Sequence, residues 1–431
     1  MNERPGTRSI RCGNKKLFIF AICTFGFLSQ HLAHGAGFQI PNQSLKAIGS
    51  AGANIAYTPG PDAAYYNPAN LSLLDDRWAL ETSLTTLWLP KIDYRDNRSS
   101  ALDGSSDLEL FFLPQIHLAS RDYHNFRFGF SLTSPYGLAK NWDQPFPRAF
   151  AGKFSLFVTE ANPSVSYKVS DHFSVAAGVR GVYAKGKVKN FVDNPPIAEI
   201  SPLTDVDRDL EANDVAYGYN LAATYRPTAD WRIATTYRSK IDLHLKGSGD
   251  LAAMFGPFPY DSYSGSANLD ITLPAVFAIA VARTFGPLTL EAAWNRTFWS
   301  DLNRLDFDYG RPVGPALATF DQPVEKDWKD SNSYRFGLTY QWSPQLTSTL
   351  GFAIEKTPVP ERTLNFEMPD SDAYMYGLGL QYAVQESLKL GVSYMYYYTT
   401  SRDVSSDSTG IDGTFDKGDA HAITVGAIAS F

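Results

Sequence analysis

The sequence predicts an all-β protein, a transmembrane antiparallel β-barrel of 14 strands with an N-terminal segment packed inside its lumen. Three observations support this prediction. Apolar and polar residues alternate with a period of two from residue 78 onward, the alternating segments are long, and short and long connections alternate between them. A tilted strand needs about 9–11 residues to cross a membrane, and short turns on one side with long loops on the other are typical of outer-membrane barrels.

The composition agrees with this fold class. The chain has 431 residues, of which 44% are hydrophobic and 14% aromatic, which suits one large barrel or two soluble domains. Aromatic residues favour strands. The formal net charge of −7 does not favour nucleic acid as a partner.

Residues 1–35 are predicted to be a signal peptide. A basic stretch precedes the apolar run Leu17–Leu28, which is too short to cross a membrane comfortably, and the small residue Gly35 precedes the expected cleavage before Ala36. The alternative is a retained membrane anchor. Both cysteines, Cys12 and Cys23, lie in this segment. The mature chain would therefore have no disulfide and no thiolate metal site, and we expect no cofactor and no metal.

Residues 36–77 precede the first predicted strand and show no alternation. This stretch is rich in small residues but also carries apolar side chains such as Ile48, Ile55 and Leu71. A 14-stranded barrel encloses a lumen, and small residues can fill it compactly. We therefore predict an N-terminal hatch over 36–77; a disordered tail, the alternative, is disfavoured by the apolar content.

Residues 78–431 are predicted to form the barrel. In "NFRFGFSLT", Phe126, Phe128 and Phe130 face one side while Arg127 and Ser131 face the other. The predicted strands are 78–88, 111–120, 125–134, 152–169, 172–188, 212–227, 230–246, 267–285, 286–301, 328–343, 346–357, 373–384, 387–401 and 419–431. The long loops lie near 89–110, 135–151, 189–211, 247–266, 302–327, 358–372 and 402–418. An even strand number places both ends of the barrel on one side.

Three local features refine the prediction. Asn162-Pro163 should interrupt the pairing of its strand, because proline cannot donate to a ladder. The alternating last strand ends on Phe431, which resembles the recognition signal of the barrel assembly machinery, a partner expected during biogenesis. Aromatic residues near strand ends are expected to form girdles at the lipid interface. They are Trp78, Trp88, Trp231, Trp299, Trp342, Tyr382 and Tyr398.

The mature N-terminal region resembles the FadL/TodX family of outer-membrane transporters of hydrophobic compounds. The shared elements are the start Ala36–Gln39 ("AGFQ"), Gly49 in a stretch of small residues, and Asn67-Pro68-Ala69. "SPYGLAKNW" (Ser134–Trp142) resembles the stretch that follows strand three in that family, and the terminal Phe431 agrees as well.

The resemblance implies how such a chain works. Hydrophobic ligands would be captured at the outer loops, pass to an interior hydrophobic site and leave sideways through a gap at a kinked strand three. Asn67, Pro68 and Ala69 would form a rigid elbow beside that gap. Gly129 is the candidate kink residue, because glycine weakens a strand interior; the alternative is packing against the hatch. Phe38 matches an aromatic residue near the family's interior site.

Two further sets of residues are candidates for ligand binding. Arg180, Arg238 and Arg335 point inward by parity and could bind a carboxylate head group. The alternative for each is a structural salt-bridge lattice. The predicted loop 247–266 is unusually apolar, as is the loop near 190–203, and such patches often bind ligands. The apolar residues of the loop 247–266, which could instead pack on one another, are Leu251, Met254, Phe255, Phe258 and Tyr260.

Together with the barrel pattern, the resemblance implies passive uptake of hydrophobic molecules such as long-chain fatty acids across the outer membrane of a Gram-negative bacterium. Uptake of aromatic or aliphatic hydrocarbons is the alternative within the same class. An outer-membrane enzyme is an alternative of another class, but no recognisable catalytic motif surrounds the five histidines of the mature chain, which disfavours it. A polar porin is disfavoured by the hatch. The expected partners are a hydrophobic small molecule, outer-membrane lipid and lipopolysaccharide, and the chain is expected to be a monomer.

Overall fold

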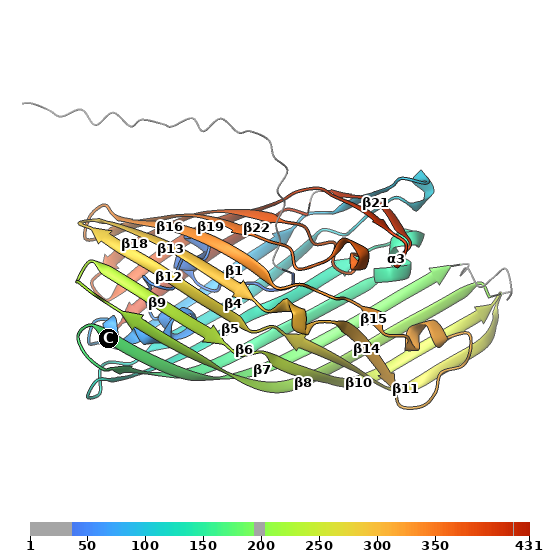
Figure 1. Ribbon diagram of the computed structural model, residues 1–431, viewed down its shortest axis with the longest axis horizontal. Helices are drawn as coiled ribbons and strands as arrows, with labels where there is room; N and C mark the ends of the chain where they lie inside the picture. The colour runs from blue at the N-terminus through green and yellow to red at the C-terminus, as the bar shows by residue number, and fades with distance from the viewer. Residues whose placement is uncertain (1–36, 194–202, 417) are drawn as a thin grey trace, which may run out of the picture. The chain divides into compact units, whose positions relative to one another are not determined.

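The computed structural model describes residues 37–193, 203–416 and 418–431, so the predicted signal peptide and Ala36 lie outside the described residues. Within the described part, 14 antiparallel strands close into a barrel, because β1 pairs with both β4 and β22 (Figure 1). These strands are β1 (Ala79–Leu89), β4 (Glu109–Ala119), β5 (Phe126–Asn141), β6 (Lys153–Lys168), β7 (Phe173–Asp193), β8 (Asp205–Tyr225), β9 (Trp231–Arg238), β12 (Val276–Phe285), β13 (Leu288–Thr297), β16 (Ser331–Gln341), β17 (Leu346–Glu355), β18 (Ala373–Gln385), β19 (Leu388–Thr399) and β22 (Ala420–Ser430). Each overlaps one predicted strand, although predicted 230–246 and 267–285 also include parts of β10 (Ile241–Phe255) and β11 (Phe258–Leu273), and the predicted fold class is confirmed.

The barrel has a turn end, with the short connections and Phe431, and a loop end, which faces outward in outer-membrane barrels. Further strands extend the wall at the loop end: β10 (Ile241–Phe255), β11 (Phe258–Leu273), β14 (Arg304–Tyr309) and β15 (Val324–Glu325). A separate small sheet contains β2 (Asp93–Asp96), β3 (Gly104–Ser105), β20 (Arg402–Ser406) and β21 (Ile411–Asp416). The helical segments are α1 (Leu45–Gly49), α2 (Ala63–Tyr66), η1 (Pro68–Leu73), η2 (Ser100–Leu102), α3 (Pro145–Ala151), η4 (Trp299–Asp301), η5 (Ala318–Asp321) and η6 (Glu361–Thr363). None of the helices in the described ranges has the length and apolar character needed to cross a membrane.

The prediction of a loop over 247–266 is wrong, because these residues belong to the hairpin of β10 and β11. Gly247-Ser248-Gly249 resembles a turn in sequence, yet it stays in the ladder between β8 and β11. A Cβ at Gly247 would lie 1.9 Å from the carbonyl oxygen of Glu211, so glycine permits the close approach of β10 to β8.

The predicted interruption at Asn162-Pro163 is confirmed. Pairing between β6 and β7 runs to Ala161 opposite Gly181 and resumes only at Ser164 opposite Gly178. The side-chain amide of Asn162 donates to the Val179 carbonyl oxygen at 2.8 Å. A side chain therefore supplies the hydrogen bond that proline cannot give.

The aromatic side chains near strand ends mostly face outward, as the girdle prediction requires. Trp88, Trp342, Tyr382 and Tyr398 are all exposed on the described barrel. Trp299 is the exception, because it is fully buried and packs inside the barrel against Phe38. Its position in η4, after β13 has ended, turns it inward.

Candidate functional site

Residues 37–76 form a compact segment, the hatch, whose backbone is held by charged side chains of the barrel wall. The Glu291 carboxylate of β13 accepts hydrogen bonds from the backbone N–H groups of Ile55, Ala56 and Tyr57 at 2.6–3.1 Å. Glu81 of β1 accepts another from the N–H of Leu45 at 3.0 Å. These contacts tie the hatch backbone to the barrel wall, in addition to the hydrogen bonds that the hatch makes within itself.

The three arginines proposed to bind a carboxylate head group lie in this supporting lattice. Arg335 pairs with Glu355 and donates to the Ala51 carbonyl oxygen at 2.8 Å. Arg180 pairs with Glu160 at 2.8 Å. None of the three lines the large cavity described below. Their geometry therefore supports the salt-bridge interpretation.

Arg238 shares Glu160 with Arg180 and also donates to the Tyr65 carbonyl oxygen at 3.2 Å. Glu160 is fully buried between the two guanidinium groups, which favour its ionised form. This cluster joins β6, β7 and β9 to the hatch. Glu160 is therefore the charged partner of both arginines within the protein.

The elbow Asn67-Pro68-Ala69 is held in place by hydrogen bonds to β7 and β8. The Asn67 side chain accepts from the Ala69 N–H at 3.1 Å and donates to the Thr224 hydroxyl of β8 at 2.9 Å. The Ala69 carbonyl oxygen accepts from Ser174 of β7 at 2.9 Å. The segment η1, which begins at Pro68, contacts β5, β6, β7 and β8, so the place of the elbow against the strand-three gap stays a prediction.

A gap in the wall does occur at strand three, between β4 and β5. The two strands pair only from Ile116 opposite Leu132 to Ala119 opposite Gly129. They meet again beyond the gap, where the Asp107 N–H donates to the Asn141 carbonyl oxygen at 2.9 Å. Between these points, residues 108–115 and 133–140 are unpaired with each other. We call this gap the window.

The window begins where β5 bulges, and not at Gly129. The register of β5 against β6 shifts between Thr133 and Tyr136, which leaves one extra residue on β5. Pro135 lies in this bulge and has no N–H to give to β4. Gly129 pairs regularly on both sides, and a Cβ there would lie 2.7 Å from the Leu71 side chain of the hatch. Gly129 is therefore a packing glycine.

The first residues of the hatch pair with β5 along the window edge. The Ile40 N–H donates to the Pro135 carbonyl oxygen at 2.8 Å, and the Gly137 N–H donates to the Phe38 carbonyl oxygen at 3.0 Å. The Gln43 amide bonds the Ser134 backbone in both directions, each at 2.9 Å. The start of the hatch thus replaces β4 as the partner of β5 on the lumen side.

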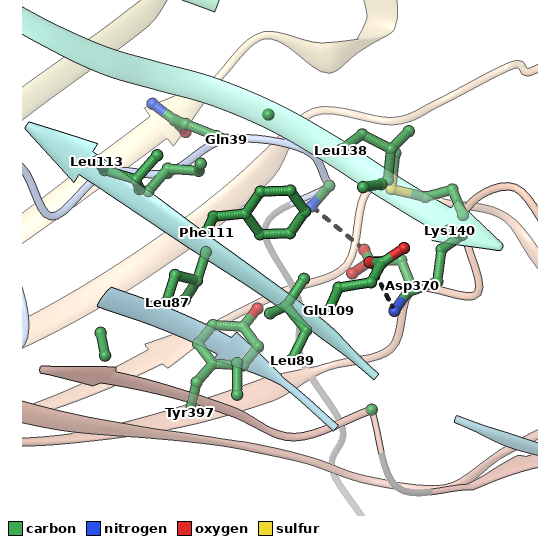
Figure 2. Close-up of a pocket in the computed structure, with 18 of the residues that line it drawn as sticks. Gln39, Leu87, Leu89, Glu109, Phe111, Leu113, Leu138, Lys140, Asp370 and Tyr397 are labelled. Carbon is green, nitrogen blue, oxygen red and sulfur yellow. Dashed lines mark hydrogen bonds and ion pairs between the residues drawn. The ribbon is translucent and has the colours of Figure 1, made fainter. Parts of the chain in front are cut away.

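Beside this hatch segment lies a cavity of about 600 Å³ (Figure 2). Its walls are mostly apolar and come from the hatch and from strands on both sides of the window. The apolar lining includes Ile40, Leu87, Leu89, Phe111, Leu113, Leu138, Met375 and Met395. Its rim includes Leu110 of β4 and Phe157 of β6, which are 51% and 44% exposed on the outer face of the barrel. The cavity therefore reaches the lipid-facing surface through the window.

Polar side chains lie at the loop end of this cavity. Glu109 of β4 and Lys140 of β5 form an ion pair at 3.7 Å across the window (Figure 2). Asp370, in the loop between β17 and β18, accepts from the Gly37 N–H at 3.3 Å. Burial raises the pKa of Asp370 to about 7. The cavity can hold a molecule with a long apolar part and a small polar part.

Phe38 is buried next to the cavity and not in its lining. Its ring packs edge-on against Trp299 at 4.8 Å between centroids and also contacts Tyr136 and Trp328. The aromatic cluster anchors the hatch start beside the window. The family resemblance placed Phe38 near the interior site, and the structure places it at the wall of that site.

The apolar residues of the predicted loop 247–266 do not gather into one patch. Leu251 is buried, whereas Phe255 and Phe258 pair across the tip of the β10–β11 hairpin and are 46% and 66% exposed. Met254 pairs with Pro259. Leu251, Phe255 and Phe258 share one face of the hairpin, but Leu251 is buried in its body while the two phenylalanines lie at its exposed tip, and Met254 lies on the other face. Part of the second apolar loop lies outside the described residues.

Sequence reasoning missed Glu109, Lys140 and the leucines of the cavity. Strand alternation marks such side chains as inward, but it does not show which inward positions border a gap. Pro135 was the available signal, because a proline next to a strand end indicates an edge without a partner.

The barrel, the luminal hatch and a lateral window onto an apolar cavity define an outer-membrane transport protein. The family described as "Outer membrane protein transport protein (OMPP1/FadL/TodX)" matches residues 27–431, and the chain belongs to that family. A long-chain fatty acid transport protein of Salmonella typhi is 26% identical over 392 residues, covering 84% of this chain and 88% of that protein.

Solved structures agree on the fold. A Pseudomonas aeruginosa FadL homologue superposes with a TM-score of 0.80 at 22% identity, covering 92% of this chain and all of that one. The Ralstonia pickettii toluene transporter TbuX superposes with a TM-score of 0.70 at 19% identity, covering 91% of this chain and 99% of that one. The predicted family and the outer-membrane location are therefore confirmed.

Proposed function

We propose that the chain takes up hydrophobic molecules with a long apolar tail, such as long-chain fatty acids, across the outer membrane. The observation that carries this proposal is the apolar cavity of about 600 Å³, which reaches the lipid-facing surface through the window. A ligand that leaves through the window enters the membrane directly and does not cross the polar turn end. Such a route suits a molecule that is poorly soluble in water.

The route has three parts. The ligand enters at the loop end, occupies the cavity beside Ile40 and Leu113, and leaves between β4 and β5. Movement of hatch residues 38–43 away from β5 would widen the window, because these residues pair with its edge. The polar hatch contacts of Glu81 and Glu291 remain in place during this movement and keep the lumen closed to ions.

Several companion proposals follow from the same picture. Residues 1–35 are removed as a signal peptide, residues 36–77 form the hatch domain, and the barrel begins at residue 78. The chain is a monomeric transporter without enzymatic activity. Its outer surface contacts outer-membrane lipid and lipopolysaccharide, and the barrel assembly machinery inserts it.

The test is an uptake measurement in an outer membrane that carries this barrel as its uptake protein. Labelled palmitic acid, toluene and a small sugar are offered separately, and a strain without the barrel is the control. We expect barrel-dependent uptake of palmitic acid and none of the sugar. Uptake of toluene alone would favour the hydrocarbon alternative, while sugar uptake with steady salt conductance in a planar bilayer would favour a porin.

A further inference from the structure

Glu109 and Lys140 occupy the two opposite edges of the window. Glu109 is the first residue of β4, and Lys140 is the last but one of β5. The Lys140 Nζ atom lies 3.7 Å from Glu109 Oε2, and their side chains are 8% and 7% exposed. Both line the cavity at its loop end. The pair therefore places a buried cation and a buried anion where the apolar cavity meets the window.

The hydrogen bonding of this pair is incomplete. The distance of 3.7 Å is longer than a hydrogen bond, and neither carboxylate oxygen of Glu109 has a donor among the residues that the structure describes. The apolar side chains Leu89, Phe111 and Leu138 of the cavity offer no donor, and Lys153, which also lines the cavity, makes no hydrogen bond to Glu109. A buried acceptor without a donor is unfavourable, so a bound molecule that donates to Glu109 would be stabilised.

The pair also specifies what kind of group can complete it. Glu109 needs a hydrogen-bond donor, and Lys140 offers donors only. A group placed between them must therefore donate on one side and accept on the other. A carboxylic acid that carries its proton does both, and so does a primary alcohol. A hydrocarbon does neither.

We propose that Glu109 and Lys140 form the head-group site of this transporter and make it selective for amphiphiles over hydrocarbons. The inference rests on the proposed function. The ligand's hydroxyl hydrogen bonds to Glu109, its second oxygen or the same hydroxyl oxygen accepts from Lys140, and its tail lies along Leu87 and Leu113. Arg180, Arg238 and Arg335 are paired with Glu160 or Glu355 and do not line the cavity, so they take no part.

The test compares three probes of equal chain length on the purified full barrel: palmitic acid, 1-hexadecanol and hexadecane. Equilibrium binding is measured for the wild type, Lys140→Met and Glu109→Leu. We expect each variant to weaken binding of the acid and the alcohol about tenfold to a hundredfold, which corresponds to losing a hydrogen bond to a charged group. Binding of hexadecane should stay unchanged.

The matched control is Lys185→Met, which removes a lysine from an outward-facing ion pair with Glu211 at 2.5 Å, outside the cavity. It should leave all three probes unchanged. Folding of every variant is checked by heat-dependent migration in gels. If Lys140→Met does not fold, Lys140→Gln replaces it, and the acid should again weaken relative to hexadecane.

The outcomes separate this inference from the proposed function. If the wild type binds all three probes and folded variants change them equally, or not at all, the head-group site is wrong while hydrophobic transport stands. If the wild type binds none of the probes, the proposed function fails and the inference fails with it. A selective loss of the acid and the alcohol supports both.

Discussion

Replacing Gln43 by alanine should release the start of the hatch from the window edge. The Gln43 amide makes two 2.9 Å hydrogen bonds with the backbone of Ser134, which is buried in the β5 bulge. Without these bonds the Ser134 N–H and C=O lose their partners in the docked state, which costs about 1–3 kcal/mol of docking free energy for each buried group. We take about 2–4 kcal/mol for the two together, which corresponds to a 30- to 1000-fold higher population of the undocked segment.

The assay is amide hydrogen exchange of the Ile40 and Gly137 N–H groups, whose hydrogen bonds join the hatch to β5. Both should exchange 30- to 1000-fold faster in the variant if they open locally. The control is Thr424→Ala, which removes a buried hydroxyl of β22 that bonds Thr85 of β1, and it should leave both exchange rates unchanged. Equal exchange of Ile40 and Gly137 in the wild type and in Gln43→Ala would refute the role of Gln43 at the window.

Three further predictions follow from the contacts of the hatch. Ala69→Trp should lower the yield of folded barrel, because Ala69 is fully buried against β7 and β8 and overpacking costs about 1–3 kcal/mol. A normal yield in a heat-migration gel would contradict this, and a loss of uptake at normal yield would support a role of the elbow in the exit route. Glu291→Ala should raise single-channel conductance in a planar bilayer, because three hatch N–H groups lose their acceptor, and an unchanged conductance would show that other contacts suffice. Burial raises the pKa of Asp370 to about 7, so the docked hatch start binds a proton more tightly than the undocked one. Docking, as measured by the protection of the Gly137 N–H from hydrogen exchange, should therefore weaken as the pH rises from about 4 to about 7 and then level off. Asp370→Asn should remove this pH dependence.

The barrel could be predicted from sequence because one physical rule applies along the whole chain. Residues that face lipid are apolar and those that face the lumen are smaller or polar, so alternation marks each strand and the turns mark their ends. The errors lie where a local signal competes with this rule. Gly247-Ser248-Gly249 resembles a turn but stays paired, and Ser134-Pro135 resembles a strand end although β5 continues to Asn141.

The site could be predicted only in part. The family resemblance pointed to a gap at strand three and to a role for the N-terminal segment, and both features occur. Parity marked Arg180, Arg238 and Arg335 as inward but could not show that Glu160, Glu355 and hatch carbonyls already bind them. The position of Asn67-Pro68-Ala69 depends on contacts across more than 90 residues, which no local pattern encodes.

The central claim, that the ligand leaves through the window, is tested by closing the window covalently. Leu110→Cys and Phe157→Cys place thiols on the exposed rims of β4 and β6, and a cleavable bis-maleimide joins them. The control joins Leu84→Cys to Val425→Cys, which lie opposite each other on the paired strands β1 and β22 and are also exposed. We predict that uptake of palmitic acid stops in the cross-linked window variant, returns on cleavage of the linker, and continues in the cross-linked control. Uptake at the wild-type rate through a fully cross-linked window would contradict the lateral route.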